Sequence, residues 1–264
     1  MVNITEDMCR NGSADRVALH TFGYVFIGTS FVAMLVLVSL DMYLAGLIVA
    51  SVLCGMAESR GRCGMSHIGM IAPMKSLDLN SWFKCSLAYT LCGTISAYLV
   101  GLLIVGLGSW IDLGKSVLYI GFSCLICVLF LLRESSLIRF NPPQCDHQTY
   151  KEWTAMFGLT TGVGMWGAHI GLALTTVITY SGLYCLLVVA FGLGFGFGEW
   201  LLVAFWLGRT VLLWVIPWLL KSSHDGLAIG INLERSTGMF RVCSFVGISS
   251  VLVVYLAKLF ALVA

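Results

Sequence analysis

Long apolar stretches that hold almost no charged residues constrain this chain more than any other feature. A helix needs about 20 apolar residues to cross the hydrocarbon core of a bilayer. The stretches that approach or exceed this length are residues 21–40, 42–57, 86–111, 116–132, 154–180, 182–208 and 242–263. Charged residues make up 11% of the chain, against about 25% in soluble domains. The sequence therefore predicts an all-α membrane protein with about seven transmembrane helices.

Three places bear on the number of spans. Asp41 separates the first two stretches, although residues 21–57 could instead form one long tilted helix. Residues 210–220 (TVLLWVIPWLL) hold two Trp and Pro217, which suits an interfacial segment or an extension of the preceding helix. The charged residues 58–78 are expected to form a loop.

The distribution of positive charge predicts the orientation. Of the 15 Lys and Arg residues, all but Lys115 and Lys258 fall on the side of the N-terminus when the chain crosses seven times. Cytoplasmic loops carry the excess of Lys and Arg. We therefore expect a multi-pass protein of a bacterial-type inner (plasma) membrane, with a cytoplasmic N-terminus and an external C-terminus. The first apolar run lacks a clear cleavage site, so we interpret it as a retained helix rather than a signal peptide.

A weak internal repeat supports this topology. Residues 88–100 (AYTLCGTISAYLV) match residues 190–202 (AFGLGFGFGEWLL), and residues 46–57 match residues 162–173 at a different offset. In the seven-span topology the matched helices run in opposite directions, which is the inverted-repeat design of many transporters. The predicted organisation is an N-terminal cytoplasmic segment with an extra helix (1–41), a first three-helix repeat (42–133), a cytoplasmic linker (134–153) and a second three-helix repeat (154–264).

The glycine-rich stretch FGLGFGFGEW (191–200) belongs to this second repeat. A nucleotide-binding loop would need β–loop–α surroundings, and an open strand edge cannot face lipid. The glycines instead form two overlapping G-x-x-x-G pairs, 192/196 and 194/198, which suit a close helix contact or a local break in the helix. Glu199 shares a helical face with Gly192 and Gly196, whereas the matched position in the first half is Ala97.

Several motifs resemble the CcdA/DsbD transmembrane family of the LysE-like superfamily. They are QTYKEW (148–153), GVGMWGAHIG (162–171), Thr175-Thr176 and LGR (207–209), and they look closest to the subgroup of the methylamine-utilisation protein MauF. The resemblance covers about residues 42–263. It implies two three-helix repeats, each opening with a broken helix that bears a small-residue and cysteine motif.

The chain departs from this family at the cysteines. Thiol-transporting members use one cysteine in the first helix of each repeat to pass reducing equivalents. Cys54 lies at the first position, but the second falls near His169 and holds no cysteine. The matching positions therefore do not support the two-cysteine shuttle. A disulfide needs two Cα atoms within about 7 Å, so Cys54 would need another partner, such as Cys185, Cys92 or Cys124.

Two ionisable residues inside predicted spans are candidates for a substrate or ion pathway. His169 shares a face with Gly162, Met165 and Thr176. Ionisable residues inside a membrane are costly and point to function by default. We assign His169, Glu199 and Thr176 to the pathway. The structural alternatives are a neutral histidine and a protonated glutamate, each hydrogen-bonded to a neighbouring helix.

Cysteines and histidines supply the remaining candidates. Cys124 and Cys127 form a C-x-x-C on one helical face, which suits a redox or soft-metal pair or simple packing. Together with Cys54 they are the candidate catalytic residues. A metal site built from two cytoplasmic loops would use four side chains: Cys63, His67, Cys145 and His147.

The leading hypothesis is a polytopic inner-membrane protein that assists maturation of a periplasmic protein or cofactor by moving a reductant, metal or small solute. One alternative is a non-catalytic membrane subunit or assembly factor; another is a membrane thiol–disulfide oxidoreductase with an unorthodox cysteine pair. The pattern favours a transporter or accessory protein over an enzyme, and it identifies no cofactor. The expected partners are the lipid bilayer and membrane or periplasmic proteins. The net charge of +2 argues against nucleic acid.

Overall fold

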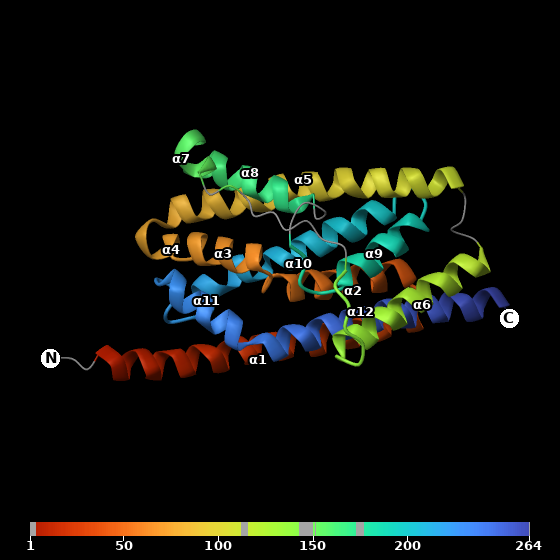
Figure 1. The fold of residues 1–264 in the computed structure, drawn as a ribbon, viewed down its shortest axis with the longest axis horizontal. Helices are drawn as coiled ribbons and strands as arrows, with labels where there is room; N and C mark the ends of the chain where they lie inside the picture. Colours follow the sequence, from red (N-terminus) through yellow and green to blue (C-terminus); the bar gives the residue numbers. More distant parts are fainter. Residues whose placement is uncertain (1–3, 112–115, 143–149, 151, 173–176, 264) are drawn as a thin grey trace.

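The computed structural model describes residues 4–111, 116–142, 150, 152–172 and 177–263, with side chains from residue 13 to residue 261 (Figure 1). These residues are all-α, as predicted. The helices are α1 (Ile4–Ser39), α2 (Tyr43–Glu58), α3 (Arg62–Ile71), α4 (Met74–Leu77), α5 (Leu79–Ile111), α6 (Val117–Glu134), α7 (Trp153–Phe157), α8 (Leu159–Gly171), α9 (Gly182–Phe191), α10 (Gly198–Leu219), α11 (Gly226–Arg235) and α12 (Thr237–Val263).

The chain is a multi-span membrane protein. Five helices of the described residues are long and apolar enough to cross a bilayer: Ser13–Ser39, Leu79–Ile111, Val117–Glu134, Gly198–Leu219 and Thr237–Ala261. The pair Tyr43–Glu58 and Arg62–Leu77 is bent by 78° and makes a sixth if it counts as one broken span. On α5, exposed leucine and isoleucine side chains recur every fourth residue from Leu91 to Leu107, which gives a continuous face for lipid.

The difference from the seven expected spans arises in the second half of the chain. The predicted span 154–180 is interrupted at Gly158, whose φ is 79°, and α8 ends at Gly171. The predicted span 182–208 divides into α9 and α10, with Gly196 at a φ of 90° between them. Glycine adopts these conformations without steric cost. Both structures expected for the glycine-rich stretch occur: the helix breaks there, and Gly192 and Gly198 lie in close contact with Tyr119 of α6 and Val105 of α5.

Three other expectations about elements are resolved. Asp41, at a φ of 58°, separates α1 from α2, so residues 21–57 are not one helix. The expectation of a loop at 58–78 was wrong, because α3 and α4 lie there. Helix α3 buries an apolar face, including Ile68 and Ile71, and this amphipathic pattern is shorter than a span. Residues 210–219 extend α10 rather than forming a separate interfacial segment.

The amphipathic helix α11 was not predicted. It begins at an N-cap, where the Asp225 side chain accepts a hydrogen bond from the Leu227 amide at 2.8 Å. Helix α5 begins in a similar way: Asp78 accepts hydrogen bonds from the Ser81 hydroxyl and from two backbone amides. These hydrogen bonds lower the pKa of Asp78 below its usual value, and the bond from the Ser81 hydroxyl has the largest effect. Both carboxylates mark helix ends outside the long apolar segments.

The helices pack closely through glycines. A Cβ on Gly55 of α2 would lie 1.8 Å from the Phe205 carbonyl oxygen of α10. A Cβ on Gly208 of α10 would lie 2.1 Å from the Val52 carbonyl oxygen of α2. Such approach of backbones is typical of membrane helices. Helix α10 packs against both α2 and α5, and α12 covers α2. Figure 1 shows the long helices running along one axis, with the two termini at opposite ends.

Candidate functional site

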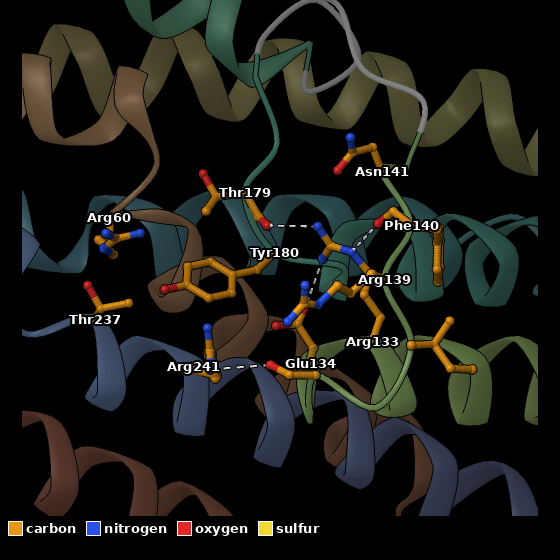
Figure 2. A pocket seen from close by; sticks show the side chains of 12 residues that line it. Arg60, Arg133, Glu134, Arg139, Phe140, Asn141, Thr179, Tyr180, Thr237 and Arg241 are labelled. Carbon is orange, nitrogen blue, oxygen red and sulfur yellow. Dashed lines mark hydrogen bonds and ion pairs between the residues drawn. The ribbon is translucent and has the colours of Figure 1, made fainter.

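A polar cavity lies where two interruptions of the helices meet. The first is the turn 59–61 between α2 and α3, and the second is the irregular segment 177–181 before α9. The cavity has a volume of about 470 Å³ (Figure 2). Its lining residues are Arg60, Arg133, Glu134, Ser136, Ile138, Arg139, Phe140, Asn141, Thr179, Tyr180, Thr237 and Arg241.

Glu58, the last residue of α2, joins the two interruptions. Its carboxylate accepts hydrogen bonds from the backbone amides of Thr179 at 2.8 Å and Tyr180 at 2.9 Å. The side chain of Glu58 is 1% exposed. Buried amides outside a helix must find acceptors, because an unpaired one costs as much as a lost hydrogen bond. One carboxylate therefore holds the irregular backbone against the end of α2.

A second carboxylate, that of Glu134 at the end of α6, lines the cavity. Glu134 accepts a hydrogen bond from the Ser181 amide at 2.8 Å and lies 3.0 Å from Arg133 Nη1. Arg133 also donates to the Ser181 hydroxyl at 2.6 Å and to the Phe140 carbonyl at 3.0 Å. The guanidinium of Arg133 is thus held by protein acceptors, and its charge is offset by Glu134.

Within the part of the chain that the structure describes, the other arginines that line the cavity make fewer hydrogen bonds to protein acceptors than Arg133 does. Arg241 of α12 lies 3.4 Å from the Ser136 hydroxyl, a long hydrogen bond. Arg60 lies near Tyr180, and its Nε is buried with no hydrogen-bond partner among the described residues. Arg139 and Arg241 are exposed. Four arginines and one glutamate line the cavity, so it can attract and hydrogen-bond an anion.

Another arginine lies deeper, on α10. Arg209 is 2% exposed, and its three guanidinium nitrogens find no hydrogen-bond partner among the described residues. Glu58 lies close enough for the two charges to attract each other, and the carbonyl oxygen of Arg209 accepts a hydrogen bond from the Ser59 hydroxyl at 2.8 Å. A buried charge is stable only with a counter-charge. Glu58 therefore serves both the irregular backbone and Arg209.

These charged residues were not predicted as site candidates. Glu58, Arg133 and Glu134 stand at the ends of apolar runs, and Arg133 was used only to predict the orientation in the membrane. An acidic residue directly after an apolar helix was the available signal. Pairing across distant parts of the chain, such as Glu58 with residues 179–180, has no signature in local sequence.

The predicted pathway residues lie elsewhere. His169 is half-buried on α8, with its ring edge-to-face with Trp153 at 5.8 Å between centroids. Glu199 is buried in the first turn of α10 and accepts a hydrogen bond from the Gly196 amide at 2.7 Å. Neither lines the arginine-rich cavity. Thr176 lies outside the described residues. Their assignment to a pathway stays a prediction.

The candidate cysteines gather with others in the apolar core. The thiols of Cys127 and Cys185 are in hydrogen-bonding contact, and Cys54 is close to both. Cys243 completes the group and donates to the Leu53 carbonyl oxygen at 3.2 Å. Of the partners suggested for Cys54, the structure brings Cys185 near it. These four thiols are buried and free, and Cys124, also buried, is a neighbour of Cys127.

The predicted metal site is only half within the described residues. Cys63 and His67 lie one turn apart on α3, and His67 packs edge-to-face with Trp166 at 4.8 Å. Cys145 and His147 lie outside the described residues. The described part of the chain holds no group of three or more His, Cys, Asp or Glu side chains arranged to bind a metal ion.

Comparisons with protein-family models, curated proteins and solved structures find no match to this chain. The structure establishes the general class of the protein: it is helical and has several apolar helices that are long enough to span a lipid bilayer.

Proposed function

We propose that this protein moves a small solute across the membrane and that the solute enters through the arginine-rich cavity. The observation that carries this proposal is the pair of interrupted helical elements, at 59–61 and 177–181, that meet at a polar cavity. Irregular backbone inside a membrane protein is tolerated where it is buried in protein or lines a water-filled space. Transporters commonly build their substrate sites at such interruptions.

The sequence repeat supports the same proposal. Residues 46–57, which match residues 162–173, belong to α2, and α2 is the first half of the bent pair. Their counterparts belong largely to α8, which ends just before the second interruption. Two matched elements that each break near the cavity suit an inverted-repeat transporter with alternating access. On the predicted topology the lining arginines face the cytoplasm.

The CcdA-like resemblance gives this transport a context. It suggests an inner-membrane protein that serves maturation of a periplasmic protein or cofactor. Metal transport has the least support, since the described residues hold no metal-binding cluster. A reductant or a small solute remains, and the charged cavity favours the solute.

Side-specific labelling tests alternating access. Thr179→Cys places a thiol in the cavity lining, and Ser109→Cys places one on the exposed far end of α5. In oriented proteoliposomes, a membrane-impermeant maleimide should reach position 179 from both sides and position 109 from one side. The unmodified chain is the control for its natural cysteines. Labelling of position 179 from one side only, under every solute condition, would contradict transport and favour an accessory subunit.

The cysteine cluster favours a second candidate, thiol–disulfide exchange. Cys127 and Cys185 are in contact, and forming a disulfide would release two protons and pass two electrons to a disulfide-bearing partner protein. Both thiols are almost fully buried, so a partner could reach them only after the helices separate. Mass spectrometry after mild oxidation tests this. A mass loss of two hydrogen atoms that disappears in Cys127→Ser and in Cys185→Ser would support exchange; unchanged thiols would exclude it.

A further inference from the structure

We propose that the arginine-rich cavity binds the phosphate group of a small molecule. The claim of binding stands on the cavity alone, whereas the claim that this molecule is the transported solute rests on the function proposed above.

The charge of the lining is unbalanced. Arg133 and Glu134 neutralise each other at 3.0 Å. Arg60, Arg139 and Arg241 remain, and the lining offers no further carboxylate to any of them. Glu58 does not line the cavity; its carboxylate accepts hydrogen bonds from two backbone amides, and its charge attracts that of Arg209. A singly charged carboxylate would offset one of the three guanidinium groups, whereas phosphate carries about two charges near neutral pH.

The donors are arranged for an anion with several acceptor oxygens. In the view of Figure 2, Arg60 and Arg241 lie on one side of the cavity with Tyr180 between them, and Arg139 lies on the other side. Guanidinium groups form planar, paired hydrogen bonds that match phosphate oxygens. The hydroxyl of Thr237 adds a neutral donor beside Arg60 and Arg241.

The size of the cavity favours a phosphate with an organic part. Its volume of about 470 Å³ falls within the range of roughly 300–1,000 Å³ that is typical of small-molecule sites. Ile138 and Phe140 line it together with the arginines, so it offers apolar surface next to the charged end. A phosphate monoester with a short carbon chain uses both parts of this lining.

The same chemistry could come from the headgroup of an anionic lipid. Arginines on the cytoplasmic side of a membrane protein attract lipid phosphates wherever they lie. Arg235 of α11 is exposed, six residues before Arg241, and lies outside the cavity. It is therefore a matched control, because its replacement removes the same charge from the same region without changing the lining.

Calorimetry in nanodiscs of zwitterionic lipid tests the inference, with inorganic phosphate and glycerol 3-phosphate as probes and glycerol and chloride as negative controls. The expected result is saturable binding of both probes, with glycerol 3-phosphate binding more tightly. Arg241→Gln and Arg139→Gln should each raise the dissociation constant at least about tenfold, whereas Arg235→Gln should change it less than twofold. Both cavity arginines are exposed, so their variants should fold normally.

Absence of phosphate binding to the folded protein would overturn the inference. An equal loss in Arg235→Gln and Arg241→Gln would also overturn it, because it would show general electrostatic attraction. Adding phosphatidic acid to the nanodiscs identifies the source: displacement of glycerol 3-phosphate assigns the site to a lipid headgroup, and undisturbed binding assigns it to a free solute. If phosphate binds but is not taken up into proteoliposomes, the proposed transport is refuted and the phosphate site stands. If a solute without phosphate is taken up and phosphate does not bind, the phosphate site is refuted and transport stands.

Discussion

Glu58 is the side chain on which most of the site depends. It accepts hydrogen bonds from two backbone amides, and its charge attracts that of the buried Arg209. A carboxylate can do this because it accepts at both oxygens and carries a full negative charge. A glutamine at this position would keep one acceptor, turn a donor toward the other amide and leave Arg209 without a counter-charge.

Replacing Glu58 should therefore destabilise the protein strongly. We expect Glu58→Gln to cost about 1–3 kcal/mol, because it removes the negative charge that attracts the buried Arg209 and leaves one backbone amide unpaired. The thermal unfolding midpoint of purified protein in nanodiscs measures this. Glu234→Gln is the control, since Glu234 is exposed on α11. A midpoint for Glu58→Gln within error of the control would contradict the role assigned to Glu58.

Glu199 can be separated into a structural and a transport role. Its Oε1 accepts from the Gly196 amide just before α10, and a carboxylate in the first turn also suits the helix dipole. We expect Glu199→Gln to lower stability by less than about 1 kcal/mol, since the amide oxygen can still accept. Uptake in proteoliposomes should then be unchanged. Loss of uptake at unchanged stability would instead support the pathway predicted from the sequence.

The sequence was informative about which side chains are unusual and silent about which meet. It singled out His169 and Glu199 because ionisable groups within apolar runs are rare. It passed over Glu58 and Glu134 because they stand at the ends of those runs, where a charge is ordinary. Their partners, residues 179–181, are far along the chain, and no local pattern encodes that contact.

The break between α9 and α10 depends on the conformational freedom of glycine at position 196 but not at position 194. Gly196 has a φ of 90°, while a Cβ on Gly194 would meet nothing within 4 Å. An L-residue in the left-handed region costs about 1–2 kcal/mol. We expect Gly196→Ala to lower stability by that amount and Gly194→Ala to leave it nearly unchanged. Equal effects of the two substitutions in denaturant unfolding would show that the backbone conformation at 196 is not the cause.

The contact between α2 and α10 depends on small residues. Because a Cβ on Gly55 would lie 1.8 Å from a backbone oxygen of α10, Gly55→Ala must push the two helices apart. We expect a loss of about 2 kcal/mol or more, in the range of severe overpacking. On the exposed α1, Gly28→Ala meets nothing within 4 Å and should stabilise the helix by about 0.5–1 kcal/mol. The two variants should thus shift the unfolding midpoint in opposite directions; a shift in the same direction would refute the packing argument.

Elements were predictable where composition decides them. The ends of α2 and α12 lie within a few residues of the predicted spans, because apolar length alone selects these helices. The interruptions at 158, 177–181 and 192–197 were harder to predict, since the same apolar residues suit a continuous helix. Whether glycine permits a contact or a break depends on the neighbouring helix, which a single sequence does not provide.

At the scale of the whole molecule, the positions of the termini bear on the number of membrane crossings. Figure 1 shows the termini at opposite ends of the axis along which the long helices run. The described residues supply five apolar helices of spanning length, or six with the bent pair. Termini on opposite sides of a membrane require an odd number of crossings. If the termini lie on opposite sides of the membrane, as the charge distribution predicts, and the bent pair makes one crossing, the short elements α8 and α9 complete another together.

Reporter fusions test this arrangement. With the N-terminus in the cytoplasm, we expect alkaline phosphatase fused at the C-terminus to be active and green fluorescent protein at the same place to be dark. Truncated fusions after residue 142, past α6, should report the cytoplasm, because the arginines around the cavity are predicted to lie there. A fluorescent C-terminal fusion would mean an even number of crossings. In that case α8 and α9 would form a re-entrant pair, and the cavity between 59–61 and 177–181 would open to one side only.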